Sequence, residues 1–336
     1  MKIFIIHNWR QEYLLWCVRQ LLKYNDAKDI IFLTDNKDLT KKYIWEDSIT
    51  YENISDYSKS ANEFAKYYQH RSYNKHQYEL FCFQRWLVIN DYVNEHDIKV
   101  FCHIDSDVLL FCNAEEYYKK NLSWYDFCYT WFCWHTSFMT KKGVNEFSVF
   151  LMNKYKNEFK LLEPYFTWEK ICSVKRNNWY IYYDRTNCVT DMTLFDIFVK
   201  EYCKLTSLKI KDIWIINDSS VFDSCINMSE WFIYNFWLKK IMWDNNRPYS
   251  FLDWDKIKKK YYFNTLHFQW ESKIFMQSYY CEESCFFKNS QQLFYRIKKW
   301  IISLAENVFK ILWIYEFARD VYLRFIRNGI DPKNNT

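Results

Sequence analysis

Apolar and polar positions along the first hundred residues alternate in a way that predicts strands and helices in turn. Residues 2–6 (KIFII) and 29–34 (KDIIFL) are apolar runs with the length of buried strands. Between them, residues 10–23 repeat apolar side chains at helical spacing. Residues 77–95 predict a longer helix, and residues 98–104 (IKVFCHI) predict a central strand. This order begins with a βαβ unit and predicts an α/β fold.

The pattern continues through the second half of the chain. We expect a helix at 141–158 and another at 191–203, the second started by Thr190 or Asp191. Further strands are expected at 126–131, 212–216, 231–236 and 261–267. Only three prolines and no Gly/Ser-rich linker interrupt these segments. Residues 1–285 are therefore expected to form one domain, followed at 286–336 by a basic, amphipathic helical tail.

Composition narrows the class of protein. Half of the residues are apolar and about a quarter are charged, which is typical of a globular chain with a substantial core. The net charge of +5 is mild and widely spread, so we expect no nucleic-acid partner. Twelve cysteines without a Cys-x-x-Cys pair indicate reduced thiols in a cytoplasmic protein. The apolar start is too short for a secretory signal, and no uncharged apolar run is long enough to span a membrane.

The chain has only 2 glycines but 17 tryptophans. Ordinary usage would give about 7% glycine, and turns in a large α/β chain usually depend on it. One interpretation is an aromatic-rich sequence that uses Asn, Asp and Ser at its turns. The other is that many tryptophans stand at glycine positions, as when a UGA codon that means glycine in its own cell is translated as tryptophan.

Asp105-Ser106-Asp107 follows the predicted central strand directly and precedes the apolar Val108-Leu109-Leu110. Open α/β sheets bind ligands at the carboxyl ends of their strands. Two carboxylates two residues apart can turn toward one divalent cation if the backbone bends there, and oxygen ligands suit Mg²⁺ or Mn²⁺. The alternative is a solvated strand end, because an Asp-x-Asp pair is common by chance.

Residues 101–111 resemble the Asp-x-Asp strand of nucleotide-sugar-dependent glycosyltransferases with the GT-A fold. Residues 266–273 (LHFQWESK) are similar to the His-x-x-Gly-x-x-Lys ending of glycosyltransferase family 8, which includes bacterial lipopolysaccharide galactosyltransferases. The resemblance is specific only at 74–111 and 264–273. It implies a GT-A-type, Rossmann-like mixed sheet flanked by helices. It also implies metal-dependent transfer of a hexose from a nucleotide-diphosphate sugar to a glycan or lipid-linked acceptor.

The same resemblance implies the site residues. Asp105, Asp107 and His267 are expected to bind Mn²⁺ or Mg²⁺. The donor is expected to contact His7, Asn8, Asp35, Arg85, Ser106, Trp270 and Lys273. For Arg85 the alternative is an ordinary charge on a helix surface, and the residues at the ends of the first two strands are chosen by position alone.

Trp270 departs from the family pattern, because it stands where the family has glycine. An indole cannot occupy a place where backbone must closely approach a phosphate. Trp9, Trp134 and Trp179 also stand where glycine would be natural. We favour a miscoded glycine at position 270, and the rival interpretation is a real tryptophan in a divergent or inactive transferase.

Asp191, at the start of a predicted helix, lies where family 8 enzymes present a polar side chain near the anomeric carbon. It is expected to be catalytic, as a base for inversion or as a stabiliser of an oxocarbenium-like transition state. The alternative is an acid favoured by the dipole at a helix start. Further candidates for sugar contacts, which could equally be turn residues, are His135, Thr136, Ser137 and Asp218.

Residues 291–328 place apolar side chains on one side of a helix, with interspersed bases and aromatic rings. We expect this tail to hold the protein on an anionic membrane surface, at the inner face of the membrane. The alternative is a helix pair packed on the catalytic domain, or a dimer contact. Two other functions remain open from the sequence: a haloacid-dehalogenase-type phosphatase, suggested by IDSDVLL, and an inactive membrane-peripheral scaffold on a transferase fold.

Overall fold

The structure is a computed structural model. It describes residues 1–8, 11–72, 74–130, 133–165, 175–177, 180–182, 189–216, 219–235 and 238–280. Residues Met1–Tyr280 form one compact unit. The predicted tail at 286–336 lies outside the described residues.

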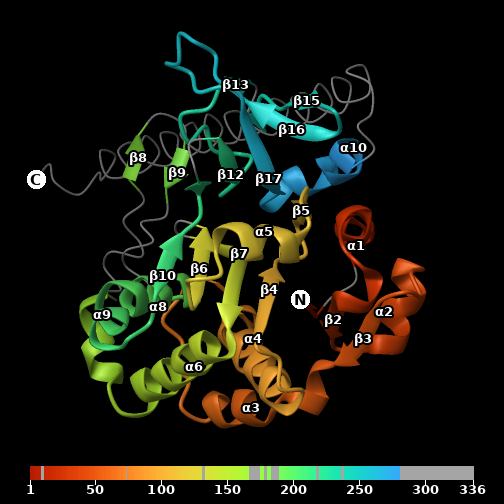
Figure 1. The fold of residues 1–336 in the computed structure, drawn as a ribbon. Helices are drawn as coiled ribbons and strands as arrows, with labels where there is room; N and C mark the ends of the chain where they lie inside the picture. Colours follow the sequence, from red (N-terminus) through yellow and green to blue (C-terminus); the bar gives the residue numbers. More distant parts are fainter. Residues whose placement is uncertain are drawn as a thin grey trace, which may run out of the picture. The chain divides into compact units, whose positions relative to one another are not determined.

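A seven-stranded mixed sheet forms the centre of this unit (Figure 1). Its strand order is β10-β6-β7-β4-β1-β2-β3. The strands are β1 (Lys2–His7), β2 (Ile30–Thr34), β3 (Thr50–Asn53), β4 (Val100–Ile104), β6 (Phe127–Thr130), β7 (Cys133–Thr140) and β10 (Ile210–Asp212). Strands β4, β1, β2 and β3 are parallel, whereas β7 runs antiparallel to both β4 and β6. The carboxyl ends of β1, β2 and β4 therefore lie at one edge, where the predicted site residues follow them.

A second, smaller sheet has the order β11-β12-β17-β16-β15, and β5 also pairs with β17. Its strands are β5 (Val108–Leu110), β11 (Ile215–Ile216), β12 (Ser220–Phe222), β15 (Met242–Asp244), β16 (Arg247–Ser250) and β17 (Tyr261–His267). Two small hairpins add β8 (Lys175–Asn177) with β9 (Tyr180–Tyr182), and β13 (Tyr234–Asn235) with β14 (Leu238–Lys239). In Figure 1 this sheet lies beyond the end of β4.

Helices flank the large sheet. They are α1 (Tyr13–Tyr24), α2 (Lys37–Ile44), α3 (Lys59–Ala65), α4 (His76–Glu95), α5 (Ala114–Asn121), α6 (Lys141–Lys156), α8 (Asp191–Ile197), α9 (Cys203–Leu205) and α10 (Met276–Tyr280). The core on one sheet face combines alternate residues of β1 and β2 with the apolar sides of α4, α6 and α8. Helix α1 instead contacts β5 and α10. The predicted α/β class, with a mixed sheet flanked by helices, is confirmed.

Several predicted elements are confirmed, including the helix at 77–95 as α4 and the strand at 261–267 as β17. The single strand expected at 212–216 is wrong, because the Asp212 side chain accepts the Trp214 N–H at 2.9 Å and turns the chain out of the large sheet. The strand expected at 231–236 begins later, as β13 at Tyr234, because the backbone of Trp231 is left-handed, with a φ of 69°, and not extended. Among the described residues, every helix is too short or too polar to span a bilayer.

Candidate metal and donor-binding site

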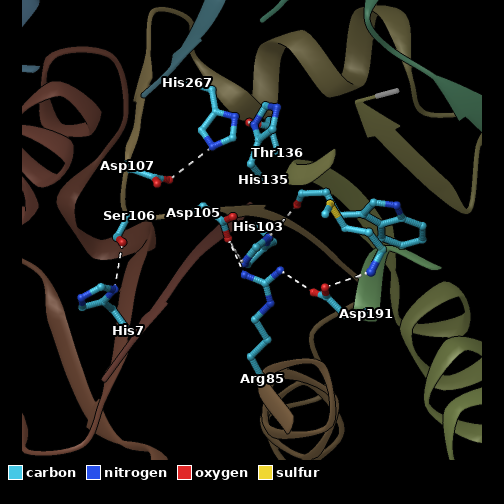
Figure 2. A network of polar contacts seen from close by, with 12 residues as sticks. His7, Arg85, His103, Asp105, Ser106, Asp107, His135, Thr136, Asp191 and His267 are labelled. Carbon is cyan, nitrogen blue, oxygen red and sulfur yellow. Dashed lines mark hydrogen bonds and ion pairs between the residues drawn. The ribbon is translucent and has the colours of Figure 1, made fainter. Parts of the chain in front are cut away.

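Asp105, Asp107 and His267 meet at the end of β4 (Figure 2). One potential ligand atom from each residue lies within 4.8 Å of the other two. The two aspartates lie in the turn between β4 and β5, which is closed by a hydrogen bond from the Val108 N–H to the Asp105 carbonyl at 3.1 Å. His267 ends β17, whose antiparallel pairing with β5 sets it opposite Val108. Residues 160 positions apart thus become neighbours through strand pairing.

The His267 ring is oriented as a metal ligand would be. Its Nδ1 lies 2.6 Å from the Ser224 carbonyl oxygen. Because a carbonyl can only accept, Nδ1 carries a proton, so Nε2 is the ring nitrogen that faces Asp107 and would offer its lone pair to a bound cation. Nε2 is 3.5 Å from the Asp107 Oδ1. Burial opposes protonation of this imidazole, but the Asp107 charge outweighs it and raises the pKa of His267.

These three residues fit a hard divalent cation. Two carboxylates and one imidazole offer oxygen and nitrogen ligands of the kind that Mg²⁺ and Mn²⁺ take. Two ligand atoms at about 2.1 Å from one ion are at most about 4.2 Å apart, so side-chain shifts of about an ångström would bring all three onto it. Burial favours a neutral carboxyl at Asp107, yet His267 and Lys273 hold its pKa well below the usual range. Asp107 is therefore charged, as a cation site requires.

Lys273 lies beside the metal-ligand candidates. It belongs to a 3₁₀ turn, Trp270–Phe275, that follows β17. Its Nζ is 2.9 Å from the Asp107 Oδ2 and 3.4 Å from the Tyr13 hydroxyl. Burial opposes the charge on this amine, but Asp107 outweighs burial and raises the pKa of Lys273. A fixed positive charge thus stands at the edge of the cation site.

Arg85 joins the cation site to Asp191. Its guanidinium projects from α4 and contacts the Asp105 Oδ1 at 2.7 Å and the Asp191 Oδ2 at 2.9 Å (Figure 2). The side chain is mostly buried, so the alternative of a surface charge on the helix is wrong. Asp191 is the first residue of α8 and also accepts the Met192 N–H at 2.9 Å. One oxygen of the Asp191 carboxylate therefore accepts a backbone N–H at the start of α8, while the other contacts Arg85.

Glu79 is a buried carboxylate that the sequence did not suggest. It lies in the first turn of α4, and its Oε1 accepts the Asp191 N–H at 3.3 Å. Its Oε2 accepts from the Ser72 hydroxyl at 2.9 Å and the Asn74 amide at 2.6 Å. Burial and the charge of Asp191 raise the pKa of Glu79 to about 7. Only a fold that brings α4 against the start of α8 reveals this contact.

The residues predicted from the strand ends are brought to the same edge. His7 Nδ1 lies 2.9 Å from the Ser106 hydroxyl, which links the end of β1 to the Asp-x-Asp turn. Burial lowers the pKa of His7 to about 4, so the ring is neutral at physiological pH. Asn8 follows it with a buried amide oxygen. Asp35, after β2, accepts from the Thr34 hydroxyl at 3.0 Å and acts on His7 through its charge.

His135, Thr136 and Ser137 are neither turn residues nor exposed contacts for a sugar. All three are buried in β7. The His135 ring stacks on His267, with centroids 3.9 Å apart, and its Nδ1 lies 3.0 Å from the Thr136 hydroxyl. His135 thus packs behind the metal-ligand candidate. Asp218 lies outside the described residues.

Trp270 is 64% exposed and has a left-handed backbone with a φ of 51°. Such a conformation is an outlier for a bulky side chain and natural for glycine. Positive φ occurs at eight described non-glycine residues: Trp45, Asp97, Glu230, Trp231, Asn245, Asn246, Lys258 and Trp270. Three are tryptophans, whereas the composition would place about 0.4 tryptophans among eight positions.

Trp134 shows a different kind of misfit. It is buried in β7, and its ring centroid lies 3.0 Å from that of Phe195. Carbon atoms in contact prefer about 3.5–4.0 Å, so the indole overfills its place in the core. Trp9 and Trp179, the other positions where glycine was expected, lie outside the described residues.

Comparison with solved structures finds partial similarities at low identity. Mouse xyloside xylosyltransferase 1 in its apo form has 8% identity and a TM-score of 0.38, covering 65% of this chain and 86% of that one. The galactosyltransferase LgtC, in complex with donor and acceptor sugar analogs, has 12% identity and a TM-score of 0.33, covering 57% and 85%. A cytidylyltransferase from Leptospira borgpetersenii has 10% identity and a TM-score of 0.32, covering 61% and 87%.

No family model matches the chain, and no curated protein matches it. With identities of 8–12% and TM-scores below 0.5, what the chain does has to be inferred from the residues of its own site.

Proposed function

We propose that the protein is a metal-dependent glycosyltransferase, which moves a hexose from a nucleotide-diphosphate sugar to a glycan or lipid-linked acceptor. The observation that carries this proposal is the convergence of Asp105, Asp107 and His267, with Lys273 beside them and Arg85 leading to Asp191.

Asp105, Asp107 and His267 would hold Mn²⁺ or Mg²⁺. When bound, such an ion supplies Lewis-acid stabilisation for the negative charge that develops on a leaving nucleoside diphosphate. Lys273 adds a fixed charge for the same diphosphate, since its amine already lies 2.9 Å from Asp107 and so within reach of any anion bound there. His7, Asn8, Asp35 and Ser106 line the adjoining strand ends, where the nucleoside would lie.

Asp191 would act on the acceptor side. The guanidinium of Arg85 contacts both Asp191 and Asp105, so it would fix the distance between the acceptor-side carboxylate and the metal-binding carboxylate. In an inverting transfer Asp191 would remove the proton of the acceptor hydroxyl. In a retaining transfer the same carboxylate would stabilise an oxocarbenium-like transition state.

The second part of the proposal concerns where the protein acts. Residues 1–285 would be the catalytic domain, and residues 286–336 a basic amphipathic tail that binds the anionic inner face of the membrane. A lipid-linked acceptor would make this placement useful, because enzyme and acceptor would share one plane.

The decisive experiment is a screen of nucleotide sugars for hydrolysis by the purified protein, in Mn²⁺, in Mg²⁺ and in EDTA. We expect release of a nucleoside diphosphate that depends on the metal. Asp107→Asn keeps the size of the side chain but removes its charge, so turnover should fall by orders of magnitude. Asp97→Asn, at an exposed aspartate away from the site, is the matched control and should retain activity.

A folded Asp107→Asn variant with near-normal turnover would show that the metal assignment is wrong. Hydrolysis of p-nitrophenyl phosphate, without any action on nucleotide sugars, would instead favour the phosphatase. That outcome would leave His267 and Lys273 without a role beside Asp107.

A further inference from the structure

A second charged cluster lies behind the candidate metal site and is fully buried. Lys239, on β14, donates from Nζ to the Glu230 Oε2 at 2.6 Å, to the Asp223 Oδ1 at 2.5 Å and to the Cys225 carbonyl at 2.8 Å. These three acceptors match the three N–H donors of an ammonium group. Both the amine and the Asp223 carboxylate are completely shielded from solvent.

All of these contacts lead to His267. The Asp223 Oδ2 accepts the backbone N–H of His267 at 3.0 Å. The Ser224 carbonyl accepts the imidazole Nδ1–H at 2.6 Å. The Ile226 N–H donates to the His267 carbonyl at 2.9 Å. Lys239 therefore holds the segment 223–226, which contacts His267, by bonding to the residues on either side of Ser224, Asp223 and Cys225.

Stability alone does not account for such a cluster. Taking charges out of water is costly, and replacing buried ion pairs with neutral groups of similar volume is often neutral or stabilising. A buried charged network is better explained where it fixes a geometry that apolar packing cannot specify. Here the geometry is the ring orientation and tautomer of a metal-ligand candidate.

We propose that Lys239, with Asp223, is a positioning residue for His267 that keeps the imidazole Nε2 aimed at the cation site. This inference rests on the proposed metal site and adds to it the support that holds one ligand in place. Partners of metal ligands of this kind typically change metal affinity by about 10–100-fold when they are removed.

The test is the affinity of the metal-free full chain for Mn²⁺ alone, measured by titration calorimetry. The variant combines Lys239→Met, Asp223→Asn and Glu230→Gln, so that no charge remains buried without a partner. We expect a folded protein whose Mn²⁺ affinity is about 10–100-fold weaker. Glu230→Gln alone keeps the contacts of Lys239 with Asp223 and Cys225, and it should bind Mn²⁺ within about twofold of wild type.

A folded triple variant that binds Mn²⁺ as tightly as wild type would overturn the positioning role. So would an equal loss in Glu230→Gln, because the effect would then be a general loosening of the cluster. If the triple variant does not fold, nitrogen-15 shifts of the wild-type His267 ring give a second test: a proton held on Nδ1, with or without a second on Nε2, is what the segment 223–226 held by Lys239 requires, whereas a neutral ring protonated only at Nε2 overturns the role. Absence of Mn²⁺ binding by wild type would refute the proposed function itself.

Discussion

Replacing Trp45 tests whether tryptophan stands at a position built for glycine. Trp45 follows α2 with φ 55° and ψ 40°, and its N–H caps the helix by donating to the Lys41 carbonyl. Glycine is the residue that this left-handed cap favours. The side chain is 83% exposed, so removing it costs only about 1 kcal/mol of burial, equally in a Gly and an Ala variant.

The comparison of Trp45→Gly with Trp45→Ala therefore isolates the backbone. A residue with a Cβ costs about 1–2 kcal/mol in the left-handed region. Glycine loses about 0.5–1 kcal/mol through its greater freedom in the unfolded chain. We expect the Gly variant to be more stable than the Ala variant by about 1 kcal/mol, measured by equilibrium unfolding in urea.

Trp124 provides the matched control, because it is 69% exposed and is not among the residues with positive φ. There the Ala variant should be at least as stable as the Gly variant. If Ala equals or exceeds Gly at position 45, the backbone there does not require glycine and the reasoning fails. The codons at the 17 tryptophan positions, among them 45, 231 and 270, give an independent check, since UGG at all of them would exclude recoding.

The remaining predictions concern the site and the tail. Lys273→Ala should weaken binding of a nucleoside diphosphate in Mn²⁺ by tenfold or more, and unchanged affinity by calorimetry would argue against its role. Burial lowers the pKa of His103 to about 4, against 6.5 for an ordinary histidine, so the stability it contributes is complete above pH 6.5 and is lost as pH falls toward 4. The stability advantage of wild type over His103→Gln should shrink across that range in urea titrations with EDTA, and a constant difference would contradict the shift. Full-length protein should sediment with anionic vesicles at low salt, and a chain ending near residue 288 should not; equal binding by both would refute the tail's role.

Local patterns in the sequence were sufficient for the elements that carry most of the site. The helix at 77–95 and the strand at 261–267 are long and strongly patterned, so α4 and β17 were predictable, and with them the placement of Arg85 and His267. The Asp-x-Asp turn was predictable because an uninterrupted apolar strand precedes it. Short elements in polar surroundings, such as β3 and α3, gave no comparable signal.

What the sequence could not reveal depends on contacts between distant segments. The resemblance to family 8 implied that Asp107 and His267 meet, but the pairing of β5 with β17 that brings them together joins residues 160 positions apart, and no local pattern encodes it. Glu79 and Lys239 have no motif of their own. Each is recognisable only by what it touches: Asp191 in one case, the segment behind His267 in the other.

The late position of β17 has a consequence for how the protein is made. Asp105 and Asp107 leave the ribosome well before His267, and at about 5–20 residues per second the delay is roughly 8–32 seconds. During that interval Arg85, which is synthesised before both aspartates, is available to neutralise Asp105, whereas Asp107 has yet to meet His267 and Lys273. A nascent chain therefore cannot close the cation site until β17 is complete.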